Sequence, residues 1–441
     1  MSIELIKIGT DGTKLGFYNP LNGSFSAEVV EENTKSLEII QTFPETELYI
    51  ELTESCNLKC QGCAVGSERI ASKDALLMEE DVLRSILAGT FRSVEDLRQK
   101  DPSRNKIKIK YAGGEPLLPK AFKLIEKAQE IMSVLGLEYP EIEFRQVILT
   151  NGVLINDEIV ERIKEWHMSV SVSLWGLGDE NDRARGMRHG FDSANKVLNG
   201  IGKLTEADIR FNVNHVVSPS NAERLKDFVS SMWDINSESF IGKDWNFPNE
   251  TKPIPVAIQF LRPQTLSQME MLESTGGAES MIVGIKEMFD VAIDLTRKGI
   301  SIPGLQKLDY LQPFDGVTAF TCGSGMNYIA AGPRGISNCH EGLFMMEQNL
   351  EKINSGENIL NIVNEPYVGN IGDIAGINRD YSNIDPSLQL ALALHGGGGC
   401  PRVEQLSGGA NLGAKSNTFT KGIYAEILPV YLSFEAERRS I

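Results

Sequence analysis

The chain has 441 residues, of which 41% are hydrophobic and 23% are charged, and its formal net charge at pH 7 is −17. This composition excludes a wholly disordered chain, and the acidic balance disfavours nucleic acid or an anionic membrane surface as a partner. No stretch approaches the ~18 uncharged apolar residues of a spanning helix, and the N-terminus lacks the basic head and apolar run of a signal peptide. We therefore expect a cytoplasmic protein with no membrane partner.

Residues 1–45 are rich in turn signals. Asp11-Gly12 and Asn22-Gly23 are dipeptides typical of hairpin turns, and apolar residues flank the first of them. We expect a small β-rich N-terminal region here.

From residue 46 to residue 300, strand and helix patterns alternate. The expected strands are 47–52, 106–112, 146–150, 169–174, 209–217 and 256–261, and the expected helices are about 79–90, 119–135, 157–166, 191–204, 221–233 and 281–298. Six βα units in series predict a parallel sheet with right-handed crossovers. Because a closed barrel needs eight units, the predicted fold class is α/β, a partial (β/α)6 TIM-like barrel whose working face lies at the C-terminal ends of the strands.

Two irregular stretches interrupt the alternation. Residues 236–254 precede the sixth strand and are expected at the bottom of the barrel, whereas residues 262–280 follow it and are expected on the working face. Loops of this length are functional or mobile, and a solvated insertion is the alternative interpretation. After residue 300 the repeat ends, and residues 327–331 and 336–338 predict a hairpin around Gly332-Pro333-Arg334-Gly335. We therefore expect a separate small C-terminal region at 301–441.

The six cysteines fall into two groups of three. In a reducing cytosol such residues are more often metal ligands or catalytic groups than disulfides. Cys56, Cys60 and Cys63 lie within eight residues directly after the first strand, and three thiolates can hold three irons of a [4Fe–4S] cube, leaving the fourth iron open to a small molecule. Two alternatives remain: a Cys60–Cys63 dithiol redox pair, or part of a zinc site that lacks a nearby fourth ligand.

This cysteine spacing resembles the CxxxCxxC motif of the radical S-adenosylmethionine (SAM) superfamily. Further motifs of that family follow in order, each at an expected strand end or just beyond one. They are Gly113-Gly114-Glu115-Pro116 for GGEP, Thr150-Asn151-Gly152 for TNG, Ser173-Leu174-Trp175-Gly176 for S-[IL]-D-G, and Arg185-Gly186 with Gly190-Phe191 for RG…GxF. A lone GGE is weak evidence, but five motifs in this order are specific.

The resemblance implies roles for these positions. Cys56, Cys60 and Cys63 would bind the cluster, whose open iron would bind the amino and carboxylate groups of SAM. The cofactor-binding candidates are Gly113 and Gly114, which would let the backbone approach the methionine moiety, Glu115 toward the SAM ammonium, Arg185 toward its carboxylate, and Ser173 and Asn151 toward the ribose or backbone groups. For Ser173 and Asn151 the alternative is ordinary hydrogen bonding at a strand end, and for Arg185 it is a surface charge beside a helix. No catalytic side chain is identified.

Two positions depart from the family pattern. The residue before the third cysteine is often aromatic in the family and near adenine, but here it is Gly62, which puts the adenine contact in doubt. Trp175 replaces the usual Asp, either as a wall facing the substrate or as a core aromatic.

The second cysteine group resembles a SPASM or twitch extension, which adds an auxiliary cluster to a radical SAM barrel. Cys322 and Cys339 flank the expected hairpin, residues 368–371 resemble the LGNI motif, and Cys400 ends a stretch similar to GGC. Cys322, Cys339 and Cys400 would therefore hold a second [4Fe–4S] cluster, giving about two in all. Its fourth ligand is open. The alternatives are zinc or three unrelated buried thiols.

The resemblance implies reductive cleavage of SAM to a 5′-deoxyadenosyl radical, with a reductant such as flavodoxin or ferredoxin as a partner. The leading hypothesis is oxidative modification or cross-linking of a peptide or protein side chain, because SPASM-type enzymes often do this. The first alternative is a dehydrogenase acting on a small metabolite such as an aminocyclitol or sugar. The second, a non-catalytic iron–sulfur electron carrier, needs no SAM pocket. With all six cysteines assigned to clusters, epimerisation through a free thiol is disfavoured.

Overall fold

The computed structural model of the chain describes most of the first 300 residues and shorter segments beyond them. The described residues are 6–10, 14–19, 24–26, 45–63, 75–186, 192–233, 254–261, 266–274, 276–300, 302, 327–333, 335–337, 350–364, 426–434 and 437–438. Within this part of the chain, no helix is both long enough and apolar enough to cross a membrane.

The N-terminal region contains a small antiparallel sheet. Strand β1 (Ile6–Thr10) pairs with β2 (Lys14–Asn19), and β2 pairs with β3 (Ser24–Ser26). These three strands lie within residues 1–45, where the sequence predicts a β-rich region, and the extent of that region stays a prediction.

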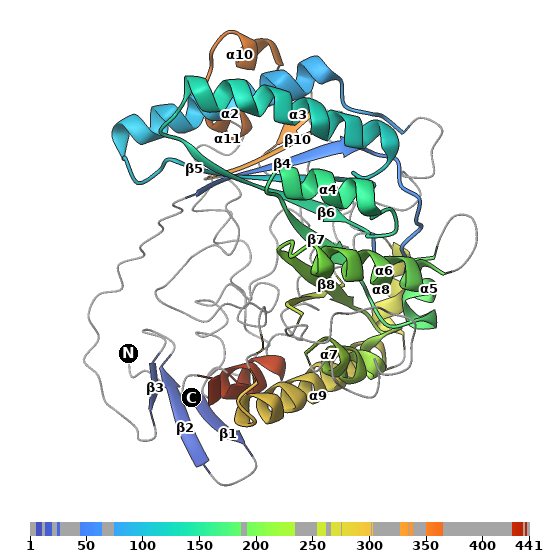
Figure 1. Cartoon of the computed structure of the whole chain (residues 1–441). Coiled ribbons are helices and arrows are strands. Elements are labelled where there is room, and N and C mark those ends of the chain that lie inside the picture. The colour runs from blue at the N-terminus through green and yellow to red at the C-terminus, as the bar shows by residue number, and fades with distance from the viewer. Residues whose placement is uncertain are drawn as a thin grey trace.

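The main sheet contains the six predicted strands in their predicted order and all parallel (Figure 1). These strands are β4 (Glu45–Thr53), β5 (Lys106–Gly113), β6 (Glu143–Thr150), β7 (Ser169–Ser173), β8 (Phe211–Val217) and β9 (Val256–Phe260). Parallel neighbours place all six C-terminal ends at one edge. The fold is therefore the predicted partial α/β barrel.

The sheet is wider than predicted because two later strands join it. The expected hairpin forms as β10 (Tyr328–Gly332) and β11 (Gly335–Ser337), and β10 pairs in parallel with β4. The eight-stranded order is β11-β10-β4-β5-β6-β7-β8-β9. The first strand of the barrel therefore has neighbours on both sides. The proposed domain boundaries at residues 45 and 300 stay predictions.

Helices cover the convex face of the sheet, as Figure 1 shows for α2, α3, α4 and α6. Their bounds are α2 (Glu80–Lys100), α3 (Pro119–Glu138), α4 (Asp157–Glu165), α5 (Asp179–Ala184), α6 (Ser193–Glu206), α7 (Leu225–Trp233) after a short 3-10 turn η1 (Ala222–Arg224), α8 (Leu266–Glu273) and α9 (Gly277–Arg297). The apolar stripe of α3 is buried as its spacing predicts: Ala121, Leu124, Ile125 and Ala128 all face the core.

Three helical features differ from the expectations. Helix α2 runs ten residues beyond the predicted end at residue 90, because buried Phe91 and Val94 continue its apolar face. Its far half is covered by α10 (Leu350–Asn354) and α11 (Ile359–Asn364), where the amide of Ile359 donates to Ser93 Oγ at 2.9 Å. The short α5 was not predicted. Residues 262–280 were expected to be irregular, but they contain α8 and the start of α9. Of residues 236–254, only the last lies among the described residues.

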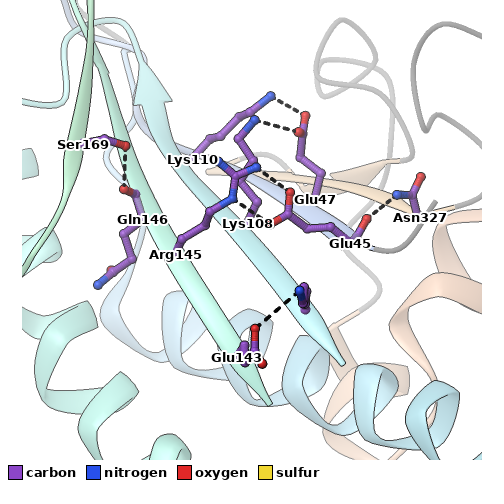
Figure 2. A network of polar contacts seen from close by, with 10 residues as sticks. Glu45, Glu47, Lys108, Lys110, Glu143, Arg145, Gln146, Ser169 and Asn327 are labelled. Atoms are coloured by element: carbon purple, nitrogen blue, oxygen red, sulfur yellow. Dashed lines mark hydrogen bonds and ion pairs between the residues drawn. The ribbon is translucent and has the colours of Figure 1, made fainter. Parts of the chain in front are cut away.

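The concave face of β4, β5 and β6 carries ion pairs instead of an apolar layer (Figure 2). Glu47 pairs with both Lys108 and Lys110, and Arg145 makes two contacts of 2.6 and 2.7 Å with the carboxylate of Glu45. Burial alone would raise the pKa of Glu47, but Lys110 and Lys108 together hold it below its ordinary value. In a closed barrel this interior is filled by branched apolar side chains. The concave face here is therefore a polar surface.

Candidate functional site

The loop that carries the first three cysteines begins at the C-terminal end of β4. Its two ends are joined, because the amide of Glu54 donates to the carbonyl of Leu76 at 2.9 Å and the amide of Met78 donates to the carbonyl of Leu52 at 2.9 Å. The carboxylate of fully buried Glu54 also accepts from the amide of Leu76 at 3.1 Å. The cysteine loop therefore starts and ends at one fixed point on the sheet.

Two further contacts hold the cysteine segment from the side of α5. The amide of Lys59 donates to the carbonyl of Gly186 at 2.9 Å, and the amide of Gln61 donates to the carbonyl of Ala184 at 3.0 Å. These bonds bring Arg185, which lies between the two acceptors, next to the cysteines. Two sequence motifs that are about 120 residues apart thus meet at one edge of the sheet.

The three thiols of Cys56, Cys60 and Cys63 are half-exposed. Burial and the negative charges of Glu115, Cys60 and Cys63 together raise the pKa of Cys56 to about 12, although the amide of Leu58 lowers it, so all three thiols lie within electrostatic reach of one another. Among the described residues, no three His, Cys, Asp or Glu side chains converge on a single metal ion. A [4Fe–4S] cube has no such need, because each thiolate binds its own iron. This donor set fits a cube better than a single zinc ion.

The two glycines at the end of β5, Gly113 and Gly114, are required by the cysteine loop. Gly113 has φ of 125°, and a Cβ there would lie 2.4 Å from the carbonyl oxygen of Thr53. A Cβ on Gly114 would lie 2.0 Å from the carbonyl oxygen of Ser55. The amides of Gly114 and Glu115 donate to Thr53 and Ser55 at 2.6 and 2.8 Å. The missing side chains thus allow the end of β5 to bond directly to the backbone before Cys56.

Glu115 is fully buried, and its carboxylate links the ends of β5 and β6. It accepts from Thr150 Oγ1 at 2.6 Å, from the amide of Asn151 at 2.8 Å and from the amide of Leu117 at 3.0 Å. Burial raises the pKa of Glu115, while these three donors and the charge of Arg185 lower it. Sequence reasoning assigned Glu115 to the ligand alone and gave Thr150 no role. The structure shows that the pair also fixes two strand ends.

Arg185 is a buried cation with no carboxylate partner among the described residues. Its side chain is 3% exposed, its Nη1 donates to the carbonyl of Ser173, and its Nε has no partner. The guanidinium carbon lies 5.3 Å from the ring centre of Trp175. A buried charge without a counterion is costly. This position therefore suits an anionic group supplied by a ligand, and a surface charge is excluded because Arg185 is buried.

Trp175 packs against the glycine that precedes the third cysteine. A Cβ on Gly62 would lie 3.3 Å from the indole of Trp175 and 2.6 Å from Cδ1 of Leu261. The indole is 6% exposed, and its residue is held by Asn181 Oδ1, which accepts from the Trp175 amide at 3.0 Å. The two departures from the family pattern, Gly62 and Trp175, are therefore in contact, and the large side chain occupies the room that the small one leaves.

The structure brings together the first cysteine group, Gly113, Gly114, Glu115, Asn151, Ser173 and Arg185 at the C-terminal ends of β4 to β7. Cys322, Cys339, Cys400, the residues of the LGNI-like motif and Gly190-Phe191 lie outside the described residues. The auxiliary cluster therefore stays a prediction. Glu54 and Asn57 were missed, and only their places beside the first cysteine in the sequence could have pointed to them.

Comparison with known proteins supports the fold class and the family that the sequence motifs indicate. The family model of the radical SAM superfamily matches residues 50–232, which span β4 to α7. These residues are a radical SAM domain, and that family implies a [4Fe–4S] cluster and SAM. The chain is 31% identical over 195 residues to the uncharacterised protein MJ0907 of Methanocaldococcus jannaschii, and 28% identical over 193 residues to the sporulation killing factor maturation protein SkfB of Bacillus subtilis. Each match covers 44% of this chain, but 61% and 40% of the relatives.

The fold is also similar to a solved structure of native anSMEcpe with bound AdoMet, which is SAM, and the Cp18Cys peptide. The two share 15% sequence identity with a TM-score of 0.62 over 90% of this chain and 100% of the other. At this identity the likeness concerns the fold alone.

Proposed function

We propose that this chain is a radical SAM enzyme that oxidatively modifies or cross-links a peptide side chain. Cys56, Cys60 and Cys63 hold a [4Fe–4S] cluster, and Arg185 binds the carboxylate of SAM. When bound and reduced, the cluster would supply the single electron for cleavage of SAM to methionine and a 5′-deoxyadenosyl radical, which would take a hydrogen atom from the substrate. A second cluster at Cys322, Cys339 and Cys400 would accept the surplus electron of the oxidised substrate.

The observation that carries the SAM site is the unpaired buried guanidinium. Arg185 lies beside the cysteine loop, and among the described residues its side chain has one hydrogen-bond partner, the carbonyl of Ser173. A SAM carboxylate would give this cation a carboxylate in direct contact, which the described protein groups do not supply. The Gly113-Gly114 backbone and the Glu115 carboxylate hold the start of the cysteine loop in place, and the carbonyl of Ser173 lies beside Arg185 at the end of β7.

A peptide substrate is supported by the lining of the concave face and by two relatives. Neutral hydrogen-bonding groups follow one another across β7 and β8: Asn212 Nδ2 donates to Asn214 Oδ1 at 3.0 Å, and Asn214 Nδ2 donates to Ser171 Oγ at 2.7 Å. Such groups match peptide amides without demanding charge. SkfB is a maturation protein by name, and the anSMEcpe structure contains a peptide.

The same neutral lining favours one alternative. Asn and Ser side chains also match the hydroxyl groups of a sugar or aminocyclitol, so a small-metabolite dehydrogenase is the second candidate. Incubation of the reduced enzyme with SAM and either a peptide library or a panel of polyols separates the two candidates. A peptide that becomes lighter by two hydrogens would support the first, and a polyol that does so would support the second. A non-catalytic electron carrier, the third hypothesis, would form no 5′-deoxyadenosine.

The test of the site uses Arg185→Met with Arg224→Met as the matched control. Arg224 is exposed, and its Nε lies 2.9 Å from the carboxylate of half-buried Glu180. Because a hydrogen bond to a charged group contributes ~1.5–3 kcal/mol, we expect Arg185→Met to weaken SAM binding by roughly 10- to 150-fold in calorimetric titration. Iron content should equal wild type in both variants. Unchanged SAM affinity in Arg185→Met would remove Arg185 from the site, and no 5′-deoxyadenosine from wild type would refute the function.

A further inference from the structure

The side-chain amide of Asn151 lies against the sulfur of Cys56. Its Nδ2 is 3.6 Å from Cys56 Sγ and 2.7 Å from Asn57 Oδ1. An amide nitrogen carries two hydrogens, so one can go to Asn57 and the other to the sulfur. The backbone amide of Leu58 is a second donor, 3.4 Å from the same sulfur. Cys56 therefore receives two N–H groups in this structure.

The position of the Asn151 amide is fixed on every side. Asn151 is 6% exposed, its backbone amide donates to Glu115 Oε2 at 2.8 Å, and its Oδ1 accepts from the amide of Val153 at 3.0 Å. Because Oδ1 is held by Val153, the nitrogen end of the side chain must face the cysteine loop. A buried side chain with both ends occupied does not turn toward solvent.

We propose that Asn151 is a positioning residue that donates an N–H···S hydrogen bond to the Cys56 thiolate and so raises the reduction potential of the cluster. The inference rests on the proposed function, since it takes Cys56 as a cluster ligand. Reduction adds negative charge to the cluster and its sulfurs, and a donor stabilises the more negative state. Asn151 thus acts through a ligand instead of touching the reacting atoms.

The negative charge of Glu115 near Cys56 is the effect that the Asn151 donor offsets. The buried carboxylate of Glu115 is a negative charge close enough to raise the pKa of Cys56. The positive charge of Arg185 acts in turn on Glu115 and opposes the rise in the pKa of Glu115 that burial causes. A buried negative charge beside the cluster opposes the entry of an electron. The same carboxylate, however, holds the backbone of Asn151, so the group that opposes reduction also fixes the donor that assists it.

The experiment compares two variants of Asn151 with a matched control. Asn151→Ser is neutral, keeps an oxygen near the amide of Val153 and is too short to reach the sulfur. Asn151→Asp keeps the size and the acceptor, but it replaces the donor with a charge. The control, Asn156→Asp, makes the same chemical change at the first residue before α4, where the amide oxygen only accepts, from the amide of Ile159 at 2.9 Å.

The measurement is the midpoint potential of the SAM-binding cluster in the full-length, iron-loaded protein, followed by electron paramagnetic resonance during a redox titration. We expect the potential to become more negative in both Asn151 variants, with a roughly tenfold change in the reduction equilibrium, or about 59 mV for one electron. Asn156→Asp should match wild type, and iron content should be equal in all four proteins.

Each other outcome overturns the inference. A shift in Asn151→Asp alone would show that added charge, not the lost hydrogen bond, moves the potential. Unchanged potentials in both variants would show that the contact with Cys56 does not tune the cluster. Failure of wild type to assemble a SAM-responsive cluster would refute the proposed function itself, and a wild-type cluster with unshifted variants would refute this inference alone.

Discussion

Gly114→Ala tests whether the glycine pair is required by the cysteine loop. The new Cβ would lie 2.0 Å from the carbonyl oxygen of Ser55, 2.5 Å from its carbonyl carbon and 2.8 Å from the carbonyl oxygen of Glu54. All three are backbone atoms, so no side-chain rotation relieves the contact. Ordinary contact begins at 3.4 Å, which requires the loop to move by 1.4 Å at its nearest atom. Ser55 directly precedes Cys56, so the first thiol would move with it.

Overpacking of this kind costs ~1–3 kcal/mol, and occasionally more. We expect Gly114→Ala to lower the free energy of unfolding in urea by about that amount. Because misplacement by ~1 Å can cost about 100-fold in rate, we also expect 5′-deoxyadenosine formation to fall by that order. Iron bound after anaerobic reconstitution should fall as well.

The matched control is Gly136→Ala in α3, where the added Cβ would meet only Phe144 Cε1 at an ordinary 3.7 Å. Replacing a helical glycine with alanine should stabilise the protein by ~0.5–1 kcal/mol and leave iron unchanged. Wild-type stability, iron and SAM cleavage in Gly114→Ala would refute the reasoning, because the loop would then have no need of the close approach.

Three further predictions concern buried groups. Glu115→Gln keeps the size of the side chain but turns one acceptor into a donor that faces Thr150 or Asn151. We expect it to lower the unfolding free energy by ~1–3 kcal/mol in urea titration. An unchanged unfolding free energy would show that Glu115 does not hold the ends of β5 and β6 together. Burial lowers the pKa of His215 from 6.5 to about 3. Between pH 6.5 and about 3 the unfolded chain therefore binds a proton at His215 that the native state does not bind. The free energy of unfolding should fall as the pH is lowered through this range, by up to ~1.4 kcal/mol per pH unit. His215→Leu should flatten that slope, and an identical profile would contradict it. Gly62→Ala should reduce bound iron, because the new Cβ would lie 2.6 Å from a methyl group of Leu261. The double variant with Leu261→Ala should restore the bound iron. If it does not, contact with Leu261 is not the cause of the loss.

The alternation of strands and helices was predictable because it is local. Each strand of the barrel is a short run whose buried residues recur within a few positions, so all six appeared at their expected places. The pairing of β10 with β4 was not predictable in the same way. Tyr328 lies opposite Glu47 in the register, and nothing in either segment's own pattern names a partner about 280 residues away. Helix α8 was missed for the opposite reason, since its eight residues show little apolar periodicity.

The site was predictable as a set of positions but not as a set of contacts. The motifs placed Glu115 just beyond β5 and Arg185 beyond β7; Glu115 lies there, and Arg185 lies at the end of α5 with its side chain against the end of β7. What the sequence could not show is that Glu115 already accepts three hydrogen bonds from the protein, whereas Arg185 has no carboxylate partner among the described residues. That difference depends on how the ends of three strands face one another, and a list of charged residues contains no such information.

The way the cysteine loop is held explains why spacing alone identified it. Four of its bonds to the rest of the barrel join backbone atoms: the carbonyl oxygens of Thr53 and Ser55 accept from the end of β5, and the amides of Lys59 and Gln61 donate to the residues on either side of Arg185. Backbone bonds fix where each residue lies without restricting which side chain it carries. The intervals between the cysteines must therefore be kept, because these bonds fix the backbone between them. The side chains whose identity matters are those that fill or vacate space around this frame, such as Gly114, whose replacement moves the frame itself.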